Sequence, residues 1–264
     1  MKLDENDLQT LKRAVDVLEH PTLTAKITDL IGMPIEKAFE ALPEKWSQKV
    51  GEITQAALRK SLELSIYTMD LNYKGESSNG MHKLLTSVSG AIGGAFGIPA
   101  LSVELPISTT IMLRSIADVA RSEGEDLNEI ETKLNCLSVF ALGGNSKNDD
   151  SVETGYYAVR ATLAKAISEA AKFITERGLT EEGAPILVRL ITKIATRYGI
   201  QVSEKAASQA VPIIGAAGGA VINLLFTDHF QSMAWGHFTI RRLEKKYNPE
   251  FIKSEYNKIK DSFK

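Results

Sequence analysis

SVSGAIGGAFGIPALSVELPISTTIMLRSIADVA, residues Ser87 to Ala120, is the stretch that decides the fold. It joins a glycine-rich apolar segment to a carboxylate followed by proline, and then to an amphipathic helical pattern. No charged residue occurs between Lys83 and Glu104. A run of about twenty uncharged residues has the length that crosses a bilayer, but its glycines and Pro99 reduce its hydropathy and helical stability. The run therefore fits either a membrane-contacting segment or a buried helix.

A second uncharged run lies nearer the C-terminal end, from Ala206 to Thr227. Both runs carry small residues at i,i+4 spacing, which are Gly90/Gly94, Gly93/Gly97, Gly215/Gly219 and Ala216/Ala220. Such ridges let two helix backbones approach closely. Each glycine destabilises a helix by about 0.5–1 kcal/mol relative to alanine, so close packing has to compensate. We therefore expect the two runs to pack against each other, with residues 212–226 on the glycines of the first run.

The rest of the chain carries helical patterns and almost no strand signals. Apolar residues recur at helical spacing, and no sustained alternation or hairpin turn is present. The expected helices, besides the segment quoted above, cover residues 5–20, 24–32, 34–42, 43–69, 128–142, 156–177, 185–199 and 203–209. Gly199 is the predicted end of one helix, and Ser203 is the predicted N-cap of the next, with Glu204 in its first turn.

These patterns predict an all-α fold, a single compact multi-helix domain over residues 1–264. Its parts are N-terminal helices within residues 5–70 and a core made by residues 84–122 and 206–245. The polar segment 145–154 is predicted to be a mobile loop.

Composition excludes some function classes. The formal net charge of −2, from 31 basic and 33 acidic residues, argues against a general nucleic-acid binder. The single cysteine, Cys136, forms no intramolecular disulfide, and its apolar surroundings predict an inert buried thiol. The charged N-terminal sequence lacks the plan of a signal peptide. These features predict a cytoplasmic protein, with a peripheral place at the inner face of the membrane as an option.

Several catalytic motifs are absent from the sequence. There is no G-x-x-x-x-G-K-[ST] phosphate loop, and the glycines at 93–97 lack the G-x-G-x-x-G spacing and a preceding strand. There is no H-E-x-x-H zinc motif and no G-x-S-x-G nucleophile elbow. We expect no cofactor.

Glu104 is the first candidate site residue, because it is the only charge between Lys83 and Arg114. A buried carboxylate has to be paired or neutral. Arg114 is the expected partner, although Asp118 at i+4 offers that arginine a local alternative. Glu104 is therefore either half of a structural ion pair, which is favoured, or a functional carboxylate.

A second candidate set follows the second uncharged run and consists of Asn223, Asp228, His229, Gln231, His237 and Arg241. The two histidines invite a metal hypothesis, but eight residues on one helix separate them by about 12 Å, too far for one shared ion. Either histidine with Glu104 and Asp228 remains an option for a metal. The favoured interpretation is that both are hydrogen-bonded packing residues, and no metal site is predicted.

At these residues the chain resembles the EcsC family of bacterial proteins. The matching segments are GAIGGAFGIPALSVELPISTTIMLRSIADVAR (90–121), GYYAVRATL (155–163) and VSEKAASQAVPIIGAAGGAVINLLFTDHFQSMAWGHFTIRRLEKKY (202–247). The resemblance covers roughly residues 20 to 260. It implies a link to ABC transporters, because the family takes its name from a protein encoded beside transporter subunits. It transfers no catalytic residues.

Three functions stay open at this stage. The favoured one is a non-catalytic accessory protein at or near the membrane, which binds a lipid-like ligand or a transporter component. Its ligand-binding candidates are Glu104, Arg114, Asn223, His229, His237 and Arg241. The second is a hydrolase that activates a water or metal with Glu104 and Asp228, His229 or His237. The third is a homo-oligomeric interaction protein joined through glycine-rich helices.

Overall fold

The computed structural model describes residues 2–40, 42, 44–68, 98–144, 155–178, 184–211 and 215–263. Over these ranges the chain forms helices and no strand, so the predicted all-α class is confirmed. The loop predicted at 145–154 and the glycines of the first uncharged run lie outside the described residues.

Most helices lie close to their predicted positions, whereas the last helix, residues 249–261, was not predicted. In chain order they are α1 (Glu5–Glu19), α2 (Leu23–Ile31), α3 (Ile35–Phe39), α4 (Trp46–Thr68), α6 (Ile98–Ser122), α7 (Ile130–Ser138) with the 3-10 turn η1 (Val139–Ala141), α8 (Tyr156–Arg177), α9 (Pro185–Ala210), α10 (Gly215–Lys246) and α11 (Pro249–Asp261). Local signals account for several ends. The Asp4 side chain caps α1 by accepting from the amide of Asp7 at 2.8 Å, and Gly32 ends α2 in the left-handed region at φ 68°.

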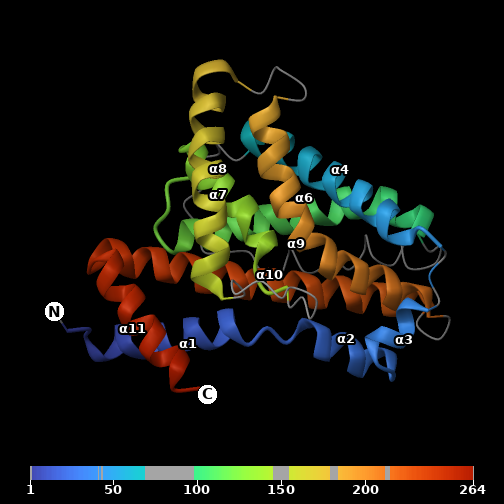
Figure 1. Ribbon diagram of the computed structural model, residues 1–264, viewed down its shortest axis with the longest axis horizontal. Helices are drawn as coiled ribbons and strands as arrows, with labels where there is room; N and C mark the ends of the chain where they lie inside the picture. Colours follow the sequence, from blue (N-terminus) through green and yellow to red (C-terminus); the bar gives the residue numbers. More distant parts are fainter. Residues whose placement is uncertain are drawn as a thin grey trace.

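Helix α10 is the centre of the molecule (Figure 1). Its 32 residues pack against α1, α2, α6, α9 and α11. In the view of Figure 1, α1 to α3 lie below α10, whereas α4, α6 and most of α9 lie above it. The buried apolar side chains of the described helices form one continuous cluster, to which α10 contributes Phe226, Phe230, Met233 and Phe238. One core therefore holds the described helices together.

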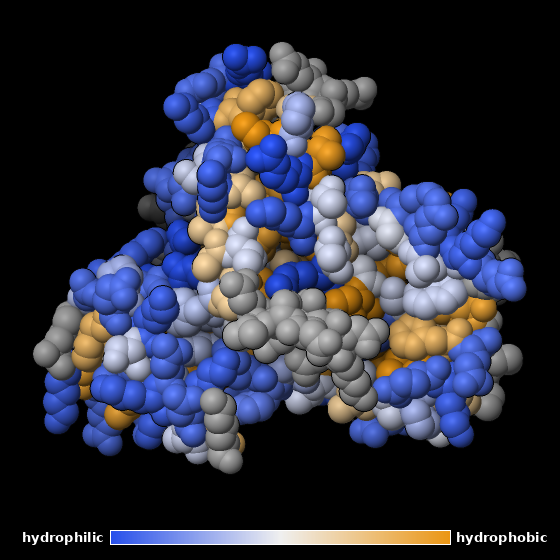
Figure 2. All heavy atoms as spheres, in the orientation of Figure 1, coloured by the Kyte–Doolittle hydropathy of each residue, from blue (hydrophilic) through white to orange (hydrophobic). Residues whose placement is uncertain are grey.

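The outer face is mostly polar. Figure 2 shows charged and polar side chains over most of the visible surface. Apolar side chains gather between α8 and α9 at the top of the view, and at the right-hand side near the junction of α9 and α10.

Helices α6 and α10 pack side by side and run in the same direction. Three contacts establish this: Glu104 meets Asn223, Ser115 meets Gln231, and Glu125, in the turn after α6, meets Arg241. Residue numbers thus rise together along the two segments. The described parts of the two core segments thus pack together as predicted. Contact between the glycines of the two runs stays a prediction, because residues 84–97 and 212–214 are not described.

Helix α9 corrects one prediction. It continues without a break from Pro185 to Ala210, so Gly199 does not end a helix and Ser203 is not an N-cap. The Ser203 hydroxyl instead donates back to the carbonyl of Gly199 at 2.6 Å, as hydroxyls do inside helices. The polar residues of this segment look like a loop in sequence, but three of them, Gln201, Glu204 and Lys205, are buried and bonded to other parts of the fold. Tertiary contacts therefore override the local signal.

Helices α1 and α10 approach closely at Gly236. A Cβ atom added to Gly236 would lie 2.8 Å from Cγ of Leu18, which is closer than side chains tolerate. By contrast, a Cβ at Gly199 would meet nothing within 4 Å. The two glycines therefore form a matched pair, since both lie inside long helices and only one is at a close contact.

We expect Gly236→Ala to lower the free energy of unfolding by about 1–2 kcal/mol, because the clash with Leu18 outweighs the gain in helix propensity. Gly199→Ala should raise it by about 0.5–1 kcal/mol, because only the propensity gain applies there. Urea denaturation followed by circular dichroism measures both. A stabilising Gly236→Ala would contradict the close approach.

Candidate functional site

Glu104 lies in a buried polar cluster made by three helices. From α9, Lys205 places its Nζ 2.9 Å from Oε1 and 2.8 Å from Oε2 of Glu104. From α10, the Asn223 amide donates to Oε1 at 2.8 Å. The side chains of Glu104 and Lys205 are 3% and 0% exposed, so the pair is removed from solvent. Glu104 is thus the carboxylate of a buried ion pair.

The charge state of Glu104 follows from two opposing effects. Desolvation by burial pushes the pKa of this carboxyl upward, but the charge of Lys205 and the hydrogen bonds from Lys205 and Asn223 outweigh it. The pKa of Glu104 therefore lies below its usual value. The carboxylate stays ionised near neutral pH, and its Oε1 accepts from both the ammonium and the amide.

The predicted pairing of Glu104 with Arg114 is wrong. Both residues lie on α6, ten positions apart, which corresponds to a rise of about 15 Å along the helix. Arg114 is exposed, whereas Glu104 faces the interior. The actual partner, Lys205, is 101 positions away in sequence. It is the last charge before the second uncharged run, just as Glu104 is the first charge after the first run.

Asp228 does not lie with Glu104. Its carboxylate is 43% exposed and pairs with Lys26 of α2, with Nζ and Oδ2 3.3 Å apart. An exposed pair of this kind contributes little to stability. Asp228 is thus a surface residue, although its neighbour on α10, His229, is buried.

His229 packs beneath the turn that ends the α7–η1 segment. Gly143 in this turn has φ 72°, and a Cβ at that position would lie 2.5 Å from the imidazole. The Nε2 atom of His229 is 3.5 Å from the amide of Gln201, which itself donates to the carbonyl of Leu142 at 2.9 Å. Burial, followed by the nearby charge of Lys26, lowers the pKa of His229 to about 4. His229 is a neutral packing residue of this turn.

His237 is buried in a different network, between α8 and α10. Its Nδ1 lies 3.0 Å from the hydroxyl of Tyr156. That hydroxyl also accepts from Arg160, at 3.4 Å. Burial, then the charges of Arg160 and Arg241, hold the pKa of His237 well below its usual value, so the imidazole is neutral.

Arg160 and Arg241 are each held by a carboxylate. Arg160 forms two bonds with Glu244, at 2.8 and 2.7 Å, and Arg241 forms two bonds with Glu125, at 2.9 and 3.2 Å. Desolvation opposes ionisation of Glu125, but Arg241 and Lys245 bring its pKa below the usual value. Both arginines therefore lie in paired, fork-like geometry.

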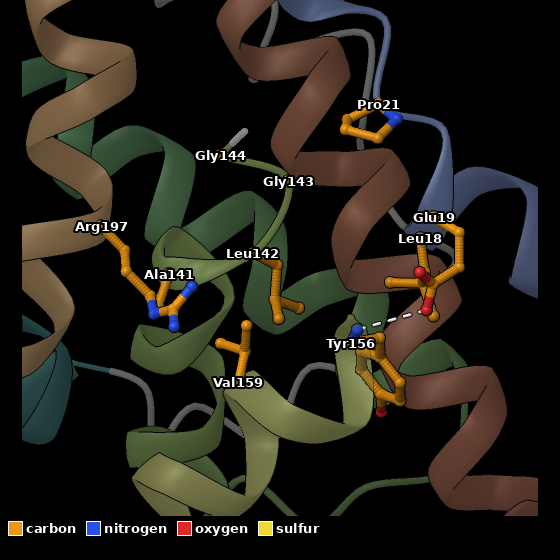
Figure 3. A pocket seen from close by; sticks show the side chains of 10 residues that line it. All are labelled: Leu18, Glu19, Pro21, Ala141, Leu142, Gly143, Gly144, Tyr156, Val159 and Arg197. Atoms are coloured by element: carbon orange, nitrogen blue, oxygen red, sulfur yellow. Dashed lines mark hydrogen bonds between the residues drawn. The ribbon is translucent and has the colours of Figure 1, made fainter. Parts of the chain in front are cut away.

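A small pocket adjoins the turn at Gly143 (Figure 3). It has a volume of about 30 Å³ and lies between the end of η1, the start of α8 and the end of α1. At its rim Glu19 accepts from the amide of Tyr156 at 3.2 Å and from the hydroxyl of Tyr256 at 2.6 Å. Figure 3 shows Arg197 on the opposite side, across Ala141 and Leu142. The volume suits a water molecule better than a substrate.

The four catalytic candidates, Glu104, Asp228, His229 and His237, therefore lie in four different surroundings. The two histidines are on one continuous helix with a rise of about 12 Å between them. Within the described ranges, no group of three or more His, Cys, Asp or Glu side chains is placed to hold a metal ion. Cys136 is fully buried, and desolvation raises the pKa of its thiol. The described geometry gives a hydrolytic reaction no common centre.

Sequence reasoning missed several residues of these networks, among them Lys205, Tyr156 and Arg160. Lys205 was detectable as the charge that borders the second uncharged run. Tyr156 and Arg160 occur in GYYAVRATL, a segment singled out only for its family resemblance. Their spacing of i,i+4 places both on one helix face, which is the usable signal.

Glu204 is a further buried carboxylate, on α9. The hydroxyl of Thr24 donates to its two oxygens at 3.0 and 3.1 Å. No cation is among the groups that shift its pKa: burial raises it, the Thr24 bond lowers it, and the charge of Glu36 raises it, to about 7. Glu204 is therefore partly protonated near neutral pH.

We expect Glu104→Gln to lower the free energy of unfolding by about 3–5 kcal/mol at neutral pH, because Lys205 would be left buried without its counter-charge. The double variant Glu104→Leu/Lys205→Met removes both charges and should recover most of this loss. Because the folded pKa of Glu104 is lowered, its contribution is present above its unfolded pKa and disappears as pH falls through the folded value. Urea denaturation of the wild type and both variants, at neutral and acidic pH, measures these changes. An equal loss of unfolding free energy in the double variant would refute the pairing.

Glu204 gives the opposite pH dependence. Because its folded pKa lies above the ordinary value of 4.5, the folded state retains a proton that the unfolded state loses, and stability falls as pH rises from about 4.5 to 7. Glu204→Gln should remove this dependence and stabilise the protein by roughly 2 kcal/mol at about pH 8. The measurement is the difference in urea midpoint between variant and wild type across pH. A difference that does not change with pH would contradict the raised pKa.

The comparisons with known proteins identify a family. The model of the EcsC protein family matches residues 5–243, which span α1 to the last turn of α10. No curated protein and no solved structure matches the chain. Because the match covers nearly all of the described helices, the chain belongs to the EcsC protein family.

Proposed function

We propose that the protein is a non-catalytic accessory protein that attaches peripherally to a membrane by contact with lipid acyl chains. The contact would use one end of the molecule, the apolar end, which we define by Val103, Ile107 and Val221. The first residues of α6 and α10, which belong to the two uncharged runs, lie there. The position of both helix starts at one end of the molecule is the observation that carries the proposal.

The parallel arrangement of α6 and α10 supports this assignment. Because the two helices run in the same direction, their N-terminal turns lie at the same end of the bundle. Residues 98–103 of the first uncharged run begin α6, and residues 215–227 of the second begin α10. The described parts of the two runs that begin α6 and α10 therefore lie side by side. Among the described helices, none combines the length and hydropathy needed to span a bilayer.

Exposed apolar side chains occur where these helices begin. Val103 is 67% exposed and Ile107 is 49% exposed, and their i,i+4 spacing places them on one face of α6. Val221 of α10 is 39% exposed. Scattered exposed apolar residues are normal, but a group that continues two uncharged runs is typical of a membrane or partner contact.

Two of the charges that border the runs, Glu104 after the first and Lys205 before the second, lie in the interior. Glu104 and Lys205 pair with each other in the interior, so neither charge is presented to a lipid surface. An apolar contact without flanking charges depends on burial of hydrophobic area, and salt therefore affects it little. This distinguishes the proposed attachment from binding through a basic patch.

We expect the wild-type protein to co-sediment with vesicles of phosphatidylethanolamine and phosphatidylglycerol, with little dependence on salt. Val103→Glu/Ile107→Glu should reduce the bound fraction by about tenfold, because two apolar side chains lose their burial and two charges are added. Phe263→Glu is the matched control: it adds a charge at an exposed aromatic residue after α11, away from the apolar end, and should bind as wild type does.

Circular dichroism of the variants establishes that they fold. Wild-type protein that stays in the supernatant would refute lipid contact. Binding of the Val103→Glu/Ile107→Glu variant equal to that of wild type would also refute lipid contact. Retention by native membranes but not by protein-free vesicles would also contradict it, and would indicate a membrane-protein partner such as a transporter subunit instead.

A further inference from the structure

Helices α2 and α3 form a small unit that packs against two of the long helices (Figure 1). Helix α2 lies on α9 and α10, and α3 lies on α9. We call this unit, residues 23–39, the α2–α3 flap. It contributes five buried apolar side chains to the core: Leu23, Ile27, Ile31, Ile35 and Ala38. The flap is therefore part of the wall of the core.

The helical backbone is interrupted on both sides of the flap. Before α2, His20 leaves the helical region with φ −120° and ψ 62°, and Pro21 follows it. Before α4, Lys45 has φ 65°, a left-handed conformation that residues other than glycine adopt infrequently. Neither side of the flap is thus continuous with a neighbouring helix. Rotation at these two points moves the flap while α1 and α4 keep their places.

Glu204 of α9 is bonded to this flap. Its two carboxylate oxygens accept from the hydroxyl of Thr24 at 3.0 and 3.1 Å, and the residue is 8% exposed. Among the described residues, the other polar side-chain contact of α2 with the fold is the surface pair of Lys26 with Asp228. Since an exposed pair contributes little, the bond to Glu204 is the main polar contact of α2.

The charges around Glu204 do not neutralise a carboxylate at this position. On α9 the adjacent cation, Lys205, is paired with Glu104, and on α2 the ammonium of Lys26 is paired at the surface. Burial raises the pKa of Glu204, the Thr24 bond lowers it, and the like charge of Glu36 on α3 raises it, to about 7. Within the described residues, no group of α4 or α10 is among those that shift this pKa.

The protonation state of Glu204 therefore affects the closed flap and the open flap differently. A neutral carboxyl group exchanges hydrogen bonds with the hydroxyl of Thr24 and tolerates burial. An ionised carboxylate has one hydroxyl as its donor in the closed flap, and it also meets the like charge of Glu36. Opening of the flap removes that charge and lets water reach the carboxylate. Ionisation thus favours the open arrangement.

We propose that Glu204 is a proton-dependent latch, which holds the α2–α3 flap closed while it is protonated and favours opening of the flap when it ionises. The opening is local, because the buried Glu104–Lys205 pair joins α6 to α9 and does not involve the flap. It exposes the apolar side chains of the flap and the part of α9 beneath them. The inference does not depend on membrane attachment.

The sign and size of the effect follow from linkage. The closed flap retains a proton up to a pKa of about 7, whereas the open flap loses it at the ordinary value of 4.5, so opening becomes more favourable as pH rises between these values. The opening constant should increase about tenfold per pH unit in this interval and level off above it. Between pH 5 and pH 8 the expected increase is about 70-fold.

Hydrogen–deuterium exchange of the full chain, read by mass spectrometry of peptides from residues 23–39, tests the pH response. After correction for the intrinsic exchange rate at each pH, we expect the protection of the flap to fall by about 70-fold from pH 5 to pH 8. Protection of the flap that is independent of pH would overturn the latch.

A urea series at pH 7 separates local opening from global unfolding, which also releases Glu204. The flap should be at least about tenfold less protected than residues 226–240 of α10, because it opens while α10 stays folded. Its exchange should depend on urea less than half as strongly, because local opening exposes less surface. Equal protection and equal urea dependence of the two segments would overturn the local opening.

Two variants assign the response to Glu204. Glu204→Gln keeps a carbonyl acceptor for Thr24 but does not ionise, so the protection of the flap should vary by less than about threefold from pH 5 to pH 8. Asp228→Asn is the matched control, because it weakens the other polar contact of α2 and leaves Glu204 in place. It should keep the pH response of wild type. A response that persists in Glu204→Gln, or that disappears in Asp228→Asn, would overturn the assignment.

Discussion

The ion pair between Glu104 and Lys205 is the constraint on which the arrangement of the other helices depends. It joins α6 to α9, and Asn223 adds α10 to the same cluster. Buried pairs of this kind often add little net stability, because desolvation of both charges offsets their attraction. Losing one partner, however, leaves a bare charge in the core. The pair therefore acts mainly on specificity, since only a packing that brings all three segments into this register satisfies it.

The polar contacts between α6, the turn after it and α10 also fix the register of the helices. Glu104 with Asn223, Ser115 with Gln231, and Glu125 with Arg241 lie at successive levels between the two chain segments. Apolar packing alone tolerates sliding of one helix along another, because many registers bury similar areas. Three spaced polar contacts exclude the alternative registers. The apolar end depends on this alignment.

The sequence was sufficient for the fold class and for much of the helix positions, because helical periodicity and caps are local. The limits of α8 were predicted correctly, and α1 and α2 to within a residue or two. The continuity of α9 was missed, since Gln201, Glu204 and Lys205 are bonded to distant parts of the fold. The partner of Glu104 was missed for a related reason: the nearest cation in sequence, Arg114, is about 15 Å along the same helix. The small pocket at the turn of Gly143 could not be predicted, because its walls come from α1, η1, α8 and α9, whose packing no local pattern encodes.

The separation of Glu104 from its partners also bears on how the chain is made. Asn223 follows Glu104 by 119 positions, and Lys205 by 101. At about 5–20 residues per second, a ribosome needs roughly ten seconds to add that length. During this interval the first uncharged run, which ends at Glu104, has been synthesised but the helices that enclose its end have not. The nascent chain thus carries, during this interval, an apolar segment whose described end has no completed packing surface.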